Sequence, residues 1–356
     1  MRYASIMAGG SGTRLWPLST PGRPKQLLRF IAGRSLLSIS ASRLMGLIDP
    51  ANIFVCTSNN YTDQIHQELP FITPSQILGE PVGRDTLNAV GFSAAIIHKI
   101  NPRASLAILT ADHLITPVST FQSVLRAAFD FVDQMPEYLV TFGITPTYAA
   151  TGFGYLECGE TLSAAARVVT AFKEKPNAEI AQEYVKDGRH YWNSGMFVWK
   201  TATILEQIRI LAPASYEGLM AIAASYGQPE FVDKVRQIYP TLPKISIDYA
   251  VMEKAPHVAT MPMDVKWLDV GSWSSYAETI TPDAAGNRAA TADLLTLDAT
   301  NILAVSDARH LVAVMGVNDL IVINAGNVTM ICRADQSEKV KLLAQAVEKA
   351  YPDGYA

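Results

Sequence analysis

Glycines gather near the start of the chain, in the stretch MAGGSGTRLWPLSTPGRPK, which also contains cationic residues. Gly9, Gly10 and Gly12 precede Arg14 and Lys25. Glycine accepts positive φ angles and lets backbone N–H groups approach a ligand closely. The spacing fits neither the GxxxxGK[ST] phosphate loop nor the GxGxxG dinucleotide fingerprint. We therefore expect a loop of another kind that binds an anion, with Arg14 and Lys25 as its charges. The alternative is a glycine-rich turn with a surface arginine.

Two acidic residues in distant segments offer ligands for a hard cation. Asp112 follows an apolar run in SLAILTADH, and Asp269 lies between two tryptophans in WLDVGSW. Mg²⁺ prefers one or two carboxylates together with phosphate oxygens and water. An acid among tryptophans is unfavourable unless it is paired or binds a metal. The alternatives are a surface turn for Asp112 and, for Asp269, a cap of the helix that begins near Ser272. We expect His113 to support this site rather than to bind the ion.

Polar residues beside aromatic ones mark a third region. Glu174 and Lys175 lie in FKEKP, and Asn193 lies in YWNSGMF. Adjacent acid, base and amide groups suit a sugar, whose hydroxyls need both donors and acceptors. A charged strand edge is the alternative for FKEKP. The sequence shows no Ser–His–Asp or Cys–His arrangement, so we expect no covalent nucleophile.

Alternating strand and helix patterns must position these residues. Short apolar runs predict strands at 3–9, 52–58, 105–113 and 138–144, and helical spacing predicts helices at 34–48, 83–100 and 120–135. Such alternation predicts a parallel sheet covered by helices on both faces. Ligands of these sheets bind at the carboxyl ends of the strands, where the glycine loop and Asp112 fall.

The rest of the chain follows other patterns. Residues 150–200 predict paired strands, and residues 201–260 are mostly helical. One helix with apolar positions from Val340 to Tyr351 closes the chain. Before it, short and closely spaced strands are expected at 302–307, 310–316, 319–325 and 328–334.

The composition predicts a globular protein with a substantial core. Of the 356 residues, 49% are hydrophobic and 17% are charged, and the net charge is −4. No basic stripe appears, which argues against nucleic acid and membrane surfaces as partners. No apolar run is long enough to span a membrane, and the first residues are too few for a signal peptide. Three scattered cysteines predict neither a disulfide framework nor a metal cluster, which indicates a cytoplasmic protein.

Eight motifs occur in an order that resembles one family. They are AGGSGTRLWPLS…PKQ, GEPVGRDT, ADHLI, TGFGYLE, FKEKP, WNSGMF, SIDYAVMEK and WLDVGSW. Together they resemble the bacterial mannose-1-phosphate guanylyltransferase (GDP-mannose pyrophosphorylase) family over roughly residues 1–280, with a weaker resemblance beyond. The first motif marks only the wider sugar-nucleotidyltransferase superfamily, and WNSGMF and SIDYAVMEK narrow it to the mannose enzymes.

The resemblance implies a reaction and a fold. GTP and mannose 1-phosphate would give GDP-mannose and pyrophosphate, with Mg²⁺ required. The expected fold class is α/β. A Rossmann-like mixed, mainly parallel sheet flanked by helices would form a catalytic domain at 1–285. A small β-rich, left-handed β-helix-like domain with a terminal helix would follow at 286–356. Some members of the family carry a fused isomerase domain, and that second activity is not expected here.

The resemblance also assigns roles to residues of this sequence. Catalysis would depend on Arg14, Lys25, Asp112 and Asp269, the two aspartates holding the metal. The GTP phosphates would lie against Gly9, Gly10, Ser11, Gly12, Thr13, Arg14 and Lys25. The segment near the base would contain Glu80, Arg84 and Asp85. The sugar phosphate would bind near Gly154, Glu174, Lys175 and Asn193.

Three departures from the family pattern bear on specificity. The chain has GRDTLNA where the family usually has GRNTAPA, so that Asp85 replaces an asparagine and Asn88 a proline. TADH also stands where PSDH is common. The first two changes lie near the expected base, and so they concern the choice of nucleotide rather than the type of reaction.

Several functions remain open at this level. The nearest alternative is the same reaction on another sugar 1-phosphate or nucleotide, and the second is a non-catalytic sugar-nucleotide sensor on the same fold. A dinucleotide-dependent oxidoreductase is disfavoured by the glycine spacing. A homodimer is expected, because the C-terminal strands would offer edges that need cover.

Overall fold

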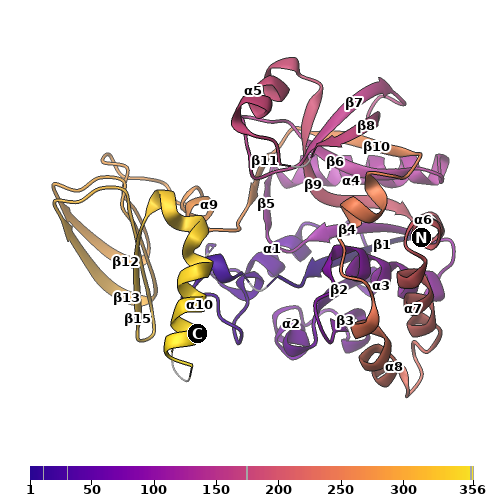
Figure 1. Ribbon diagram of the computed structural model, residues 1–356, viewed down its shortest axis with the longest axis horizontal. Helices are drawn as coiled ribbons and strands as arrows, with labels where there is room; N and C mark the ends of the chain where they lie inside the picture. The colour runs from indigo at the N-terminus through magenta and orange to yellow at the C-terminus, as the bar shows by residue number, and fades with distance from the viewer. Residues whose placement is uncertain (11, 30, 174, 353–354, 356) are drawn as a thin grey trace. The chain divides into compact units, whose positions relative to one another are not determined.

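The computed structural model describes residues 1–10, 12–29, 31–173, 175–352 and 355 (Figure 1). The chain divides into two compact units that each combine distant parts of the sequence. The first unit comprises Met1–Gly9, Ser40–Ala111 and Ile115–Trp267, and the second comprises Gly10–Ile39, Asp112–Leu114 and Leu268–Ala356.

A nine-stranded mixed sheet forms the first unit. Its order is β3-β2-β1-β4-β9-β6-β10-β8-β7. Strands β1, β2, β3 and β4 pair in parallel, and β10 is parallel to β6, whereas β9 is antiparallel to both β4 and β6. The bounds are β1 (Arg2–Ala8), β2 (Ile53–Ser58), β3 (Ile77–Glu80), β4 (Ser105–Thr110), β6 (Leu139–Ile144), β7 (Tyr155–Thr161), β8 (Arg167–Lys173), β9 (His190–Lys200) and β10 (Val258–Met263). The expected α/β fold with a mixed sheet is confirmed.

Helices pack on this sheet or on one another. They are α2 (Thr62–Glu68), α3 (Asp85–Ile100), α4 (Val118–Gln134), α5 (Ala178–Asp187), α6 (Thr201–Leu211), α7 (Pro213–Ala224), α8 (Phe231–Ile238) and the π-helical turn η7 (Asp248–Met252). The expected apolar face of α3 is buried, as shown by Leu87 and Ile97. A Cβ atom on Gly91 would lie 2.5 Å from Leu219 Cδ1, so this glycine lets α7 pack closely on α3.

One predicted helix is much shorter in the structure. The pattern at 34–48 predicts a long helix, but α1 covers only Leu36–Ser42. Single turns follow it, and Gly46 adopts a φ of 76°. A left-handed residue ends a right-handed helix, which explains why the apolar spacing beyond α1 does not continue it.

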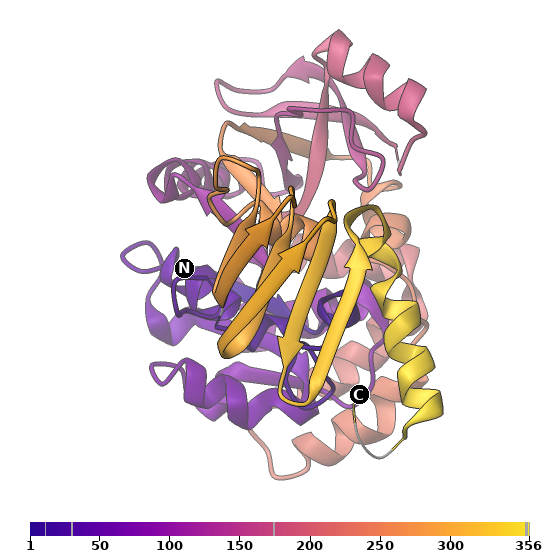
Figure 2. The same cartoon turned by 90° about the vertical axis from the view of Figure 1, so that its left-hand side faces the viewer.

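A four-stranded sheet dominates the second unit. Strands β12 (Arg288–Leu297), β13 (Leu303–Met315) and β14 (Leu320–Ala325) run parallel, and β15 (Val328–Arg333) is antiparallel to β14. Figure 2 shows these four strands side by side. In a β-helix, consecutive strands lie next to one another and run parallel, as β12, β13 and β14 do. The expected C-terminal β-rich fold is therefore confirmed. The two strands expected at 302–307 and 310–316 form the single strand β13.

The glycine loop belongs to the core of this second unit. Its short turns η1 (Thr13–Leu15) and η2 (Lys25–Leu27) join α9 (Trp273–Ala277), η8 (Ala334–Lys339) and α10 (Val340–Ala350). Leu15, Trp16 and Leu18 pack in one buried cluster with residues of β13, β14, β15 and α10. The residues that follow the glycines are therefore held by side chains from the last 90 residues of the chain.

A two-stranded ladder completes the fold. Strand β5 (His113–Thr116) pairs with β11 (Lys266–Asp269). No helix among the described residues is long and apolar enough to cross a membrane.

Candidate active site

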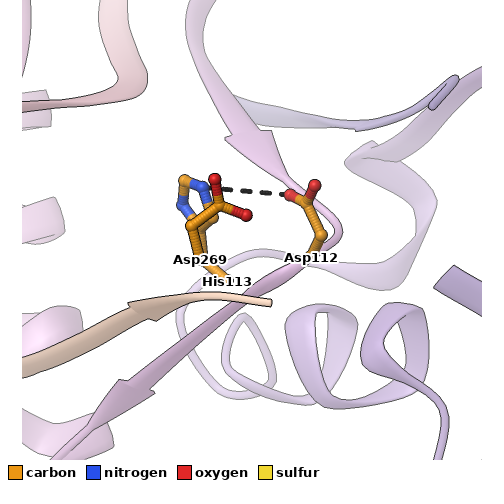
Figure 3. Close-up of side chains that lie close together, drawn as sticks. All are labelled: Asp112, His113 and Asp269. Atoms are coloured by element: carbon orange, nitrogen blue, oxygen red, sulfur yellow. Dashed lines mark ion pairs between the residues drawn. The ribbon is translucent and has the colours of Figure 1, made fainter. Parts of the chain in front are cut away.

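Asp112, His113 and Asp269 meet in the second unit. Asp112 lies where β4 passes into β5, and Asp269 is the last residue of β11. The Val270 N–H donates to the Asp112 carbonyl oxygen at 3.2 Å, which joins the two segments. One potential ligand atom from each of the three side chains lies within 4.8 Å of the others (Figure 3). Two aspartates 157 positions apart in the sequence are thus brought together.

Lys25 of the glycine loop binds the first of these acids. Its Nζ atom lies 2.6 Å from Asp112 Oδ2, and His113 Nε2 lies 3.9 Å from Asp112 Oδ1. Burial alone raises the pKa of Asp112, but the charges of Lys25 and His113 outweigh it and lower this pKa to about 2. Asp112 is therefore a carboxylate at neutral pH, and it can bind a cation without first losing a proton.

Asp269 has an unsatisfied oxygen. Its Oδ1 atom is buried and accepts no hydrogen bond from any residue that the structure describes. The alternative role as a helix cap is not what the structure has, because Ser272 is the N-cap of α9 and accepts from Ser275 N. A buried carboxylate oxygen without a donor is unfavourable and suits a bound cation. The residues of this site fit a divalent metal ion.

The glycine loop is shaped around Lys25. Gly12 has a φ of 67°, and a Cβ atom there would lie 2.5 Å from Lys25 Cβ and 2.9 Å from Ser19 Oγ. Gly10 is less constrained, because its Cβ position lies 3.8 Å from Lys25 Cε. Any other residue at Gly12 would strain the backbone and displace the lysine. Ser11 lies outside the described residues.

Arg14 emerges from the turn η1 beside Thr13 and makes an ion pair that the sequence did not suggest. Its Nη1 atom lies 2.6 Å from Glu338 Oε2 on η8. Its Nη2 atom lies 3.2 Å from the position that a Cβ on Gly271 would take, and Asp269 Oδ1 lies 3.4 Å from that position. The absent side chain of Gly271 therefore leaves room for the Arg14 guanidinium next to the Asp269 carboxylate.

Gly9 and Glu80 lie together in the first unit. A Cβ atom on Gly9 would be 3.2 Å from Glu80 Oε2, and Tyr239 donates its hydroxyl hydrogen to Glu80 Oε1 at 2.6 Å. Burial raises the pKa of Glu80 to about 7, although the hydrogen bond from Tyr239 opposes the rise. The sequence placed Glu80 near the base but offered no sign of its buried partner Tyr239.

Arg84 and Asp85 lie at the start of α3. The Arg84 guanidinium donates to the Pro240 carbonyl oxygen. Asp85 is exposed, has a φ of 65°, and accepts from Thr86 N at 2.8 Å. Asparagine and aspartate tolerate this left-handed conformation better than most residues, so an asparagine could adopt the same backbone at this position.

Asn88, which replaces the usual proline, supports this segment. Its amide nitrogen donates to the Arg84 carbonyl oxygen at 2.9 Å and to the Pro243 carbonyl oxygen at 2.7 Å. Asn88 therefore holds the backbone of Arg84 against the 240–243 segment and is buried away from solvent.

The Asn193 side chain has a defined orientation. Its Nδ2 atom donates to Asp248 Oδ1 at 2.9 Å, and its Oδ1 atom accepts from Thr141 Oγ1 at 3.1 Å and Gly195 N at 3.2 Å. Its backbone N–H donates to the Gly154 carbonyl oxygen at 2.9 Å, so two residues predicted to bind the sugar phosphate are adjacent. Asp248 was not predicted as a site residue, although it lies in SIDYAVMEK. Lys175 has a φ of 39°, and Glu174 lies outside the described residues.

The chain matches models of two domain families. The nucleotidyl transferase model matches residues 3–285, and the MannoseP isomerase/GMP-like beta-helix domain model matches residues 293–346. The first match covers well over half of the chain, so the chain is a nucleotidyl transferase by family and by fold.

Individual relatives narrow the class. Mannose-1-phosphate guanylyltransferase 2 of Escherichia coli O157:H7 is 35% identical over 97% of this chain and 73% of its own length. Mannose-1-phosphate guanylyltransferase of Klebsiella pneumoniae is 34% identical over 94% of this chain and 72% of its own length. A crystal structure described as mannose-1-phosphate geranyltransferase from Thermus thermophilus superposes with a TM-score of 0.87 at 30% identity. The match covers 98% of this chain and 99% of that one. The chain belongs to the mannose-1-phosphate guanylyltransferase family and is a transferase enzyme.

Proposed function

We propose that this protein transfers GMP from GTP to mannose 1-phosphate, giving GDP-mannose and pyrophosphate. The names of its relatives support both substrates. One structural observation carries the proposal: Asp112 and Asp269 lie within ligand distance of one another, next to the cations of the glycine loop. Two carboxylates alone would repel a triphosphate, so their place beside an anion-binding loop is explained by a cation between them and the ligand.

The metal in this proposal is Mg²⁺, held by Asp112 and Asp269. When bound, it would offset charge on the α-phosphate and on the leaving pyrophosphate. His113 supports the pair, because its ring lies near Asp112 and is itself buried.

The chain's own groups position the reactants. The backbone N–H groups from Gly9 to Thr13, Ser11 included, bind the triphosphate, and Arg14 and Lys25 add positive charge. A phosphate oxygen of mannose 1-phosphate attacks the α-phosphorus of GTP. The bond between the α-phosphorus and the oxygen that bridges it to the β-phosphorus breaks, and pyrophosphate leaves. The sugar phosphate is already an anion at neutral pH, so no general base is needed. Positioning and electrostatic stabilisation supply the catalysis.

Substrate recognition is assigned to the first unit. Glu80, Arg84 and Asp85 contribute to the site of the base, and Gly154, Glu174, Lys175 and Asn193 contribute to the site of the sugar phosphate. The proposal also includes a domain boundary between residues 285 and 286, a homodimer and a cytoplasmic location.

Pyrophosphate release tests the proposal. Purified protein is mixed with GTP, mannose 1-phosphate and Mg²⁺, with EDTA as the control, and the assay is repeated with five nucleotides against mannose and glucose 1-phosphates. Release that needs all three components is expected. Tight binding of GDP-mannose without turnover would favour the sensor, and faster turnover of another pair would reassign the substrates.

A further inference from the structure

The segment that follows the glycines is fixed by the C-terminal region. Leu15 is fully buried and Trp16 nearly so. Trp16 Nε1 donates to the Tyr355 carbonyl oxygen at 3.1 Å, and Trp273 Nε1 donates to the Trp16 carbonyl oxygen at 3.0 Å. Both the ring and the backbone of Trp16 are thus bound by residues more than 250 positions away. Arg14 precedes this anchored pair, so its Cα position is well defined.

The end of the Arg14 side chain is held by one acid. Glu338 Oε2 accepts from Arg14 Nη1 at 2.6 Å. The side chains of Arg14 and Glu338 are 41% and 64% exposed, and ion pairs this exposed contribute little to folding stability. The effect of this pair is therefore expected on the orientation of the Arg14 guanidinium rather than on folding stability.

The orientation of the Arg14 guanidinium bears on the site formed by Asp112 and Asp269. With Nη1 on Glu338, Nη2 lies 3.2 Å from the position that a Cβ on Gly271 would take, and Asp269 Oδ1 lies 3.4 Å from the same position. A guanidinium has five N–H donors in a planar fork, so one hydrogen bond to Glu338 leaves the others for phosphate oxygens. A side chain that is already oriented loses less conformational freedom when the ligand binds.

We propose that Glu338 is a positioning residue, which holds the Arg14 guanidinium beside the carboxylate site so that it can bind the triphosphate. The inference rests on the proposed function for the role of Arg14, and it extends the active site into the β-helix-like C-terminal region. An exposed acid competing with phosphate for Arg14 would have the opposite effect on nucleotide affinity, which makes the sign of the effect decisive.

Glu338→Gln tests the proposal, because it removes the charge and keeps the shape. We expect the KM for GTP to rise about threefold to tenfold, a range between the effects of an exposed ion pair and of a charge-assisted hydrogen bond. The KM for mannose 1-phosphate and the unfolding temperature should stay unchanged. Glu338→Asp, which keeps the charge on a shorter side chain, should restore part of the affinity.

A matched control lies on the same element. Asp335 of η8 pairs with Arg333 at 2.7 Å, and both side chains are exposed. Asp335→Asn removes a comparable surface ion pair and should leave both KM values unchanged. In an Arg14→Ala background, Glu338→Gln should add no further effect, because the interaction it removes is already absent.

Nucleotide binding separates this inference from the proposed function. Affinity is measured by calorimetry, without the sugar phosphate, for whichever of the five nucleoside triphosphates binds the wild-type protein most tightly. A wild type that binds this nucleotide without turnover contradicts the proposed function alone. The positioning role of Glu338 is overturned if Glu338→Gln binds the nucleotide as tightly as the wild type or more tightly. It is also overturned if Asp335→Asn loses as much nucleotide affinity as Glu338→Gln.

Discussion

The Lys25 ammonium lies 2.6 Å from the carboxylate of Asp112, so the glycine loop and the segment that follows strand β4 are joined through one ion pair. Lys25 is buried, and a Cβ atom on Gly12 would collide with it. The lysine predicted from the sequence to bind phosphate therefore also neutralises an acid predicted to bind metal.

Replacing Lys25 tests this double role. Lys25→Met should lower kcat by about 100-fold or more, the scale observed when one preorganised electrostatic group is removed. The Mg²⁺ concentration for half-maximal rate should not rise, because Asp112 loses a competitor for its oxygen. Lys25→Arg keeps the charge and should retain more activity. A near-normal kcat in Lys25→Met, measured by pyrophosphate release, would contradict the assignment.

The two aspartates should behave as one unit. Asp112→Asn and Asp269→Asn should each lower kcat by orders of magnitude, with only partial rescue by added Mg²⁺. The combined variant should be little worse than either alone, because groups that act together are not additive.

Ser272→Ala is the control for Asp269. Ser272 caps α9, so its replacement should reduce the free energy of unfolding by about 1 kcal/mol and leave kcat unaffected. If Asp269→Asn instead turns over normally at limiting Mg²⁺, the shared-metal role of Asp269 is wrong.

Asp85 should affect the choice of nucleotide. A carboxylate can accept from both N1–H and the amino group of guanine, and adenine offers no such pair of donors. Asp85→Gly tolerates the φ of 65° and removes the carboxylate, so it is a cleaner test than alanine. Loss of a charge-assisted hydrogen bond corresponds to roughly a tenfold to hundredfold loss. The kcat/KM for GTP divided by the kcat/KM for ATP should fall by this factor. An unchanged value would show that Asp85 takes no part in recognising the base.

Much of this site could be predicted, because its residues lie in short motifs at the ends of apolar strands. Asp112 follows β4 directly, so the strand pattern placed it at the carboxyl edge of the sheet, whereas Asp269 was predicted from its position between two tryptophans. We expected the two acids to lie close together because a cation between them and the phosphates would explain both carboxylates. The individual strands were predictable where all positions are buried, as in β6, or all but the last, as in β2.

Other features depend on tertiary contacts that local sequence does not encode. Glu338 lies in ADQSEK, a segment typical of an exposed turn, and its partner Arg14 is 324 positions away. Strand β12 alternates half-buried and exposed positions with small residues, so its apolar signal is weak. The boundary at residue 285 and the roles of the base and sugar residues remain predictions.

Glu80 should make the stability of the fold depend on pH. Its pKa is about 7 in the folded protein, against 4.5 for an exposed glutamate. Between these values the unfolded chain loses its proton while the folded protein keeps it, so the free energy of unfolding should fall as pH rises from about 4.5 to 7. The fall should amount to about 3 kcal/mol.

Glu80→Gln should flatten this slope in urea unfolding measured across that range. Tyr239→Phe removes the hydrogen bond that opposes the shift, and so it should extend the fall to higher pH. A slope that is unchanged in Glu80→Gln would assign the pH dependence to another group.

The last prediction concerns Asp248, which orients Asn193. The amide of Asn193 is bound at both ends, by Asp248 Oδ1 on Nδ2 and by Thr141 Oγ1 and Gly195 N on Oδ1. An amide nitrogen has two hydrogens, and the second hydrogen of Nδ2 has no acceptor among the residues that the structure describes. A sugar hydroxyl or phosphate oxygen can accept it. Asp248→Ala frees the amide to rotate, so the KM for mannose 1-phosphate should rise more than the KM for GTP.

Asp248→Asn is the matched control, since its side-chain oxygen can still accept from Asn193. It should stay close to wild type, whereas Asn193→Ala should resemble Asp248→Ala, and the combined variant should be no worse than Asn193→Ala alone. The measurements are KM values for both substrates and the unfolding temperature, which separates loss of orientation from loss of fold. Additive effects of Asp248→Ala and Asn193→Ala would show that Asp248 acts independently of the asparagine.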